Sequence, residues 1–149
     1  MIAVPEQVVD ANNTFTGGLK GARGVYKFGL NSKENVICYN ITLTGFQGEY
    51  QSPAISATHV HEAVRGKAGP PRLAFPNPMP VTNCKDTRRS IGCLVGTKDG
   101  FVTGVVNAAT GKDNGFGFSV KKIEENPAGF FADVHSSKAV PGAIRGQIE

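Results

Sequence analysis

The sequence predicts an all-β protein, an antiparallel Greek-key β-sandwich or barrel formed as one domain over residues 1–149. The length of 149 residues fits a single domain with a sizeable core. The 19 Gly and 9 Pro residues suit many short segments joined by turns better than long helices. Short apolar segments follow one another with turn residues between them, and this pattern is typical of such a sandwich.

The clearest predicted strand is residues 35–46. Its residues Ile37, Tyr39, Ile41 and Leu43 alternate with other residues and share one face by the strand period of two. Further strands are expected over residues 24–30, 54–63, 90–97, 101–108, 128–136 and 142–149, the last two separated by a turn over 137–142.

Three other segments are predicted not to be central strands. The first twenty residues are polar and resemble a loop. Residues 69–78 contain too much proline for a central strand, so a loop or an edge strand is expected there. Residues 118–127 are expected to form one short helix that Pro127 ends.

Charge and hydropathy limit the function classes. The net charge of +4 comes from scattered Lys and Arg, with one small pair at Arg88 and Arg89. Because aromatic residues do not alternate with these cations, no nucleic-acid partner is predicted, whereas an acidic glycan or a small anion stays compatible. No apolar run is long enough to span a membrane, and the first residues lack the basic region and long apolar core of a signal peptide.

The three cysteines and two sequons favour a secreted glycoprotein. Cys84 and Cys93 bracket a polar segment, so a disulfide closing that loop is predicted, with Cys38 left unpaired and buried in its strand. N-glycosylation sequons begin at Asn12 and Asn40. The alternative is a cytosolic protein in which these sequons occur by chance.

The three histidines form a candidate metal site. His59 and His61 lie in an H-V-H triplet on a predicted strand, and His135 ends a later one. Residues i and i+2 of a strand point to the same side with Cα atoms about 7 Å apart, so both imidazoles can reach one metal ion and His135 can supply a third ligand. The alternative is that His59 and His61 are polar residues on a solvated face and His135 is a satisfied core or turn histidine.

Two segments together resemble a known family. Residues 57–70 read ATHVHEAVRGKAGP and residues 130–148 read FFADVHSSKAVPGAIRGQI. They resemble the CHRD domain, named from chordin and also found in bacterial and fungal secreted proteins. The resemblance covers the motif-bearing part, residues 57–148, and departs at Ala143, where the family usually has an acidic residue.

The resemblance implies an immunoglobulin-like sandwich similar to copper/zinc superoxide dismutase. In that enzyme an H-V-H-E run and a C-terminal V-H bind copper, and an arginine beyond them guides superoxide. His59, His61, His135 and Arg145 match these positions, which makes Arg145 the candidate catalytic residue. The alternative for Arg145 is a strand residue that ties the C-terminal hairpin to a neighbouring carbonyl or carboxylate.

The departures from superoxide dismutase limit the site to one metal. No fourth histidine exists, and residues 66–80 contain no carboxylate, so a two-metal site is excluded by ligand count. What is expected is copper, with zinc as the alternative, held by three imidazoles with one open position. Glu62 and Asp133 are expected on the opposite strand faces from the histidines, as solvated or strand-pairing residues.

Three functions follow from these observations. The first is a secreted mononuclear copper protein, with superoxide dismutase-like oxidoreductase activity as its enzymatic form. The second is a non-catalytic extracellular module that binds a wall polymer or a partner protein. The third is a module stabilised by zinc, without redox chemistry.

Overall fold

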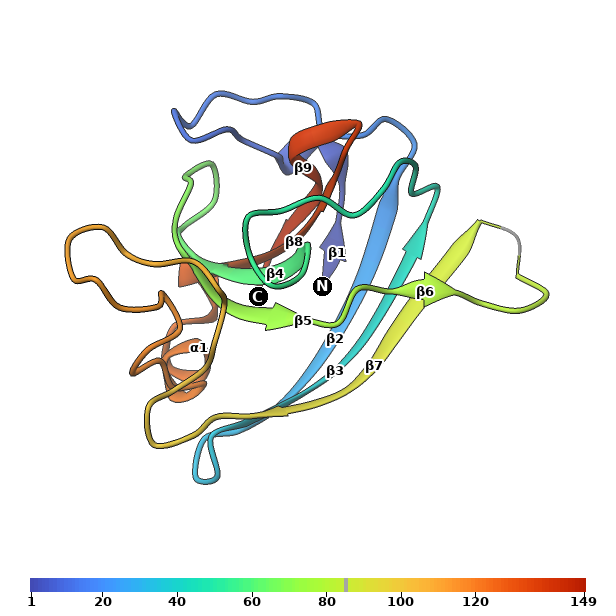
Figure 1. Ribbon diagram of the computed structural model, residues 1–149. Coiled ribbons are helices and arrows are strands. Elements are labelled where there is room, and N and C mark those ends of the chain that lie inside the picture. The colour runs from blue at the N-terminus through green and yellow to red at the C-terminus, as the bar shows by residue number, and fades with distance from the viewer. Residues whose placement is uncertain (85) are drawn as a thin grey trace.

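A computed structural model describes residues 1–84 and 86–149, which form two antiparallel sheets packed face to face (Figure 1). The first sheet has the order β1 (Ile2–Ala3), β2 (Arg23–Asn31), β3 (Val36–Thr44), β7 (Thr87–Val95) and β6 (Met79–Pro80). The second has the order β5 (Pro71–Phe75), β4 (Thr58–Glu62), β8 (Phe130–Ser136) and β9 (Ala139–Gln147). The short helix α1 (Lys121–Glu125) and the 3-10 turns Pro5–Gln7 and Pro127–Gly129 complete the described elements. The predicted all-β sandwich is confirmed.

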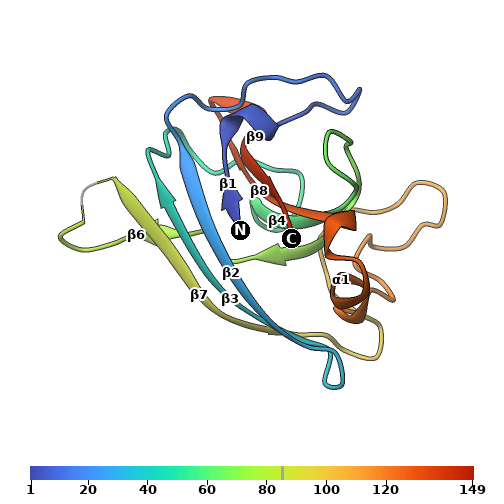
Figure 2. The same ribbon diagram turned by 180° about the vertical axis from the view of Figure 1, so that it is seen from behind.

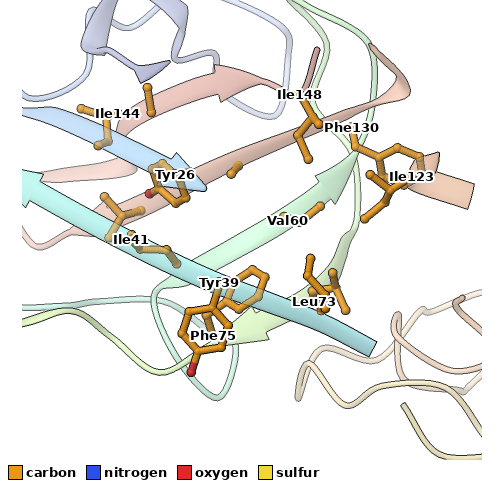
Figure 3. Packing of buried hydrophobic residues seen from close by; sticks show 14 of the residues in the cluster. Tyr26, Tyr39, Ile41, Val60, Leu73, Phe75, Ile123, Phe130, Ile144 and Ile148 are labelled. Atoms are coloured by element: carbon orange, nitrogen blue, oxygen red, sulfur yellow. The ribbon is translucent and has the colours of Figure 1, made fainter. Parts of the chain in front are cut away.

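The core lies between the two sheets and is built by side-chain alternation. In β3 the residues Ile37, Ile41 and Leu43 are at most 1% exposed, whereas their neighbours along the strand face outward. Figure 3 shows Tyr39 of β3 beside Phe75 of β5, with ring centroids 4.9 Å apart. Because Val60 of β4 enters this core, its neighbours His59 and His61 lie on the outer face of the second sheet.

Most predicted elements are confirmed. β2, β3 and β7 correspond to the strands expected at 24–30, 35–46 and 90–97, with ends that differ by up to three residues. The proline-rich segment 69–78 supplies β5, an edge strand of its sheet. The short helix expected within 118–127 is α1, and it ends at Glu125, before Pro127.

Two predictions about elements are wrong. Residues 101–108 form no regular strand, because Gly104 has a φ of +79° and the amides of Thr103 and Gly104 donate to the Asp113 carboxylate instead of to a neighbouring strand. The N-terminal residues are not all loop, since β1 pairs with β2. Val8 and Val9 behind it are buried, which anchors the N-terminal segment on the protein.

The predicted Cys84–Cys93 disulfide is wrong. Cys93 lies opposite Cys38 in the register of β7 on β3, and these two residues form the disulfide. Cys84 precedes β7, and Cys93 lies well along that extended strand, roughly 20 Å from its first residue at about 3.3 Å per residue. A disulfide tolerates Cα separations of only about 7 Å, so Cys84 is out of reach. Cys38 is exposed rather than buried, because it alternates with the buried Ile37 and Tyr39.

The exposed thiol of Cys84 gives a direct test of this pairing. Native protein treated with iodoacetamide should gain a single alkyl group at Cys84, because the other two sulfurs are oxidised. After reduction and unfolding, all three cysteines should react. Intact-mass measurement followed by peptide mapping checks both steps, and native labelling at Cys38 or Cys93 would contradict the pairing.

Candidate metal centre

The three histidines meet on the outer face of the second sheet. β4 supplies His59 and His61, and the neighbouring strand β8 supplies His135. One ligand atom from each of these, together with one from Asp133, lies within 4.8 Å of all the others. Residues far apart in the sequence are therefore brought to a single point by the pairing of β4 with β8.

Asp133 is the member of this group that the sequence analysis misplaced. It lies two residues before His135 on the same strand, so the period of two puts both side chains on one face rather than on opposite faces. Its carboxylate oxygens lie 3.5 Å from His59 Nδ1, 3.3 Å from His61 Nε2 and 3.1 Å from His135 Nε2. The D-V-H spacing in the sequence was therefore enough to predict that Asp133 and His135 share one face of their strand.

Glu62, by contrast, points away from the histidines. It follows His61 directly, so it belongs to the other face of β4. There its carboxylate forms an ion pair with Arg72 of β5, with Oε2 2.7 Å from Nε. Glu62 is therefore a strand-pairing residue and has no part in the cluster.

Each imidazole is oriented by a backbone carbonyl on its far side. His59 Nε2 lies 2.7 Å from the carbonyl oxygen of Ser56. His61 Nδ1 lies 2.8 Å from the carbonyl oxygen of Gly69, and His135 Nδ1 lies 3.0 Å from that of Val140. A carbonyl only accepts hydrogen bonds, so these far nitrogens carry the protons. In the neutral rings the near nitrogens are therefore unprotonated and face the carboxylate of Asp133, the arrangement expected of metal-ligating histidines.

Several buried polar atoms that face the centre of the cluster have no hydrogen-bond partner among the described residues. They are His59 Nδ1, His61 Nε2 and Asp133 Oδ1. Three nitrogen lone pairs facing a carboxylate repel one another unless a positive charge lies among them. Three imidazoles and a carboxylate are suitable ligands for Cu²⁺ or Zn²⁺, so the residues present fit either ion.

Without a metal, a proton supplies part of that positive charge. Burial opposes protonation of His135, but the Asp133 carboxylate outweighs it and raises the pKa of His135 to about 9. Burial likewise raises the pKa of Asp133, but the neighbouring imidazoles of His61 and His135, the latter with a hydrogen bond to the carboxylate, outweigh it and hold that pKa well below its ordinary value. The metal-free cluster is therefore a charged pair with two further imidazoles beside it.

A cavity of about 260 Å³ opens onto the cluster. Its walls come from the N-terminal residues 8–11, from Ala68 and Gly69, and from Pro141 and Gly142 of the last hairpin. His61 and His135 line this cavity and have 12% and 15% of their side chains exposed, whereas His59 is only 2% exposed. A small molecule can therefore reach His61 and His135 through this cavity.

The comparison with known families supports the resemblance noted in the sequence. The CHRD domain family model matches residues 5–148, which is nearly the whole chain and extends well before the two motifs. The chain belongs to the CHRD domain family. Neither a curated protein nor a solved structure matches it.

In this CHRD domain Arg145 is buried in the wall of the cavity and is bound to backbone carbonyls. It is 2% exposed, and its Nη1 and Nη2 donate to the carbonyls of Lys67 at 2.7 Å and Val64 at 3.0 Å. Its guanidinium also lies 3.5 Å from the ring centroid of Phe131, which stacks against His61. Burial lowers the pKa of Arg145 to about 10, so it remains a cation at neutral pH.

These contacts make Arg145 a positioning residue for His61. The loop that Arg145 holds continues to Gly69, whose carbonyl accepts from His61 Nδ1. The same guanidinium packs on Phe131, the ring against which the His61 imidazole is stacked. Through the loop and the ring, Arg145 fixes the orientation of one histidine of the CHRD cluster.

Arg145→Lys separates positioning from charge in the CHRD domain. Lysine keeps the positive charge but lacks the planar fork that reaches two carbonyls at once. We expect copper affinity to fall about tenfold, as is usual when the orienting partner of a ligand is lost. Competition with a copper chelator measures the affinity, and a thermal melt checks folding. Unchanged affinity would contradict a positioning role for the guanidinium of Arg145.

Proposed function

We propose that this chain is a secreted CHRD-domain protein that binds one copper ion through His59, His61 and His135. The observation that carries the proposal is the convergence of three imidazole nitrogens whose opposite nitrogens are all held by backbone carbonyls. Asp133 lies close enough to act as a fourth ligand or as the charge partner of the ion. Zinc is the alternative metal, because it uses the same donors.

The chemistry proposed for this site is superoxide dismutase-like. Bound copper would supply one-electron redox chemistry there. His59 is the sequestered ligand, whereas His61 and His135 face the cavity through which a small anion such as superoxide would enter. Arg145 adds positive charge beneath that cavity and keeps His61 in place, so its proposed contribution is electrostatic and positional rather than direct contact.

An extracellular location is part of the proposal. The Cys38–Cys93 disulfide is of the kind that persists in oxidising compartments. No helix in the described part of the chain is long and apolar enough to cross a membrane. The sequon at Asn12 lies in an exposed turn, which suits a glycoprotein.

Metal analysis and spectroscopy test the proposal. Purified protein titrated with Cu²⁺ should bind one equivalent, and its electron-spin resonance spectrum should show splitting from several imidazole nitrogens. A superoxide-consumption assay on the copper-loaded protein then tests the redox activity separately. Binding of zinc in preference to copper would favour the zinc-stabilised module, and absence of binding of either metal would sink the metal proposal.

One observation favours a second candidate, a non-catalytic extracellular module that binds a glycan or a protein partner. The raised pKa of His135 lets a proton provide positive charge in the cluster without any metal. In that case the histidines and Asp133 form a structural ion-pair network, and the partner is bound elsewhere on the surface.

A further inference from the structure

The outer face of the five-stranded sheet is a broad uncovered surface. β2, β3 and β7 lie side by side, and no element in the described part of the chain packs on the side away from the core (Figures 1 and 2). The Cys38–Cys93 disulfide crosses this face and ties β3 to β7. The face is therefore a rigid platform rather than a loop surface, and it lies away from the histidine cluster, which is on the outer side of the other sheet.

The charge on this platform has one sign. β2, β3 and β7 contain no Asp or Glu at all. Arg23, Lys27 and Arg89 are exposed on it, and none of them forms an ion pair with a residue that the structure describes. Arg89 donates instead to the amide oxygen of Asn40 at 3.0 Å. The platform therefore attracts an anionic partner without a competing carboxylate of its own.

The rest of the platform offers hydroxyl, amide and aliphatic groups. A shallow groove of about 480 Å³ runs over Lys27, Gly29, Asn40 and the disulfide. Ile91 lines it and is 64% exposed, and Val95, further along the same face of β7, is 68% exposed. A side chain at Gly29 would meet open space, so the groove floor lies free for a ligand.

We propose that this platform binds an acidic polysaccharide whose charge comes from uronate carboxylates. Such a chain presents widely spaced carboxylates, many hydroxyls and apolar C–H faces, which match the cations, the amide and the aliphatic side chains. Arg23 and Lys27 lie four residues apart on one strand, about 13 Å, which is far sparser than the phosphates of a nucleic acid. The outward positions of the three strands hold no aromatic residue, whereas aromatic anchors are typical of protein interfaces and single-stranded nucleic-acid sites.

The test compares two triple variants with the same change in net charge. One is Arg23→Gln, Lys27→Gln, Arg89→Gln on the platform, and the other is Lys20→Gln, Lys98→Gln, Lys122→Gln outside the three strands. Binding of the full chain to polygalacturonate is measured by calorimetry at two salt concentrations, with dextran as the uncharged probe. We expect the platform variant to bind at least about tenfold more weakly, the control variant to stay within about twofold, and dextran not to bind.

Two further variants make the result specific. Ile91→Asp places a carboxylate in the middle of the platform at an exposed position, so it should weaken binding without unfolding the sheet. His135→Ala should bind polygalacturonate as the wild type does, which separates this proposal from the copper site. Equal weakening in both triple variants would overturn the proposal, and so would binding to polyglutamate or anionic vesicles with no binding to polygalacturonate.

Discussion

Replacing Asp133 with Asn should lower the pKa of His135 from about 9 to below its ordinary value of 6.5 in the metal-free protein. Burial opposes the charged imidazole, and the Asp133 carboxylate is the main contribution that overcomes this effect, ahead of the hydrogen bond to the Val140 carbonyl. An asparagine of the same shape removes that charge and leaves the burial. Titration of the His135 ring resonances by NMR measures the change.

The same variant should change how stability depends on pH. The folded-state pKa of His135 lies above its unfolded value, so its protonation stabilises the metal-free fold fully below about pH 6.5. That stabilisation is lost as the pH rises through about 9, and it amounts to roughly 3 kcal/mol. Asp133→Asn should remove this contribution to the free energy of unfolding, as measured by urea titration at pH 6 and at pH 10.

Glu62→Gln is the matched control for Asp133→Asn. Glu62 is next to His61 in sequence, but its carboxylate is bound to Arg72 on the other face of β4. Its replacement should leave the pKa of His135 near 9. An equal fall in both variants would mean that net charge, rather than the Asp133 contact, sets the pKa of His135.

Replacing His135 with Ala should weaken copper binding more than about 100-fold, beyond the loss typical of an orienting partner alone. The variant keeps His59 and His61 from one strand but loses the only imidazole that β8 contributes. The free energy of unfolding of the metal-free protein should also fall, by roughly the 3 kcal/mol that protonated His135 contributes fully below about pH 6.5, so a thermal melt first confirms that the variant is folded. Calorimetric copper titration and urea unfolding of the same preparations measure the two effects.

Val140→Ala is the control for His135→Ala. Val140 lies in the same hairpin with 56% of its surface exposed, and its contact with His135 Nδ1 is made by the backbone carbonyl. Its truncation should leave copper affinity unchanged. Equal affinity of His135→Ala and the wild type would remove His135 from the ligand set and leave the non-catalytic module as the better account.

Several features of this protein follow from the sequence alone, because they depend on the geometry of a single strand. The alternation of Ile37, Tyr39, Ile41 and Leu43 predicted both the strand and its buried face. The H-V-H spacing put His59 and His61 on one side of β4 for the same reason. Asp133 was predictable by that rule as well, since it and His135 are two residues apart.

Other features depend on which strands become neighbours, and only the tertiary structure decided them. Cys93 pairs with Cys38 because β7 lies beside β3 in one particular register, although Cys84 is much nearer in sequence. Arg145 binds carbonyls of a loop some eighty residues away in sequence, which no local pattern encodes. The physical reason is that side-chain alternation is fixed by the backbone of one strand, whereas contact partners are set by packing and pairing across the whole fold.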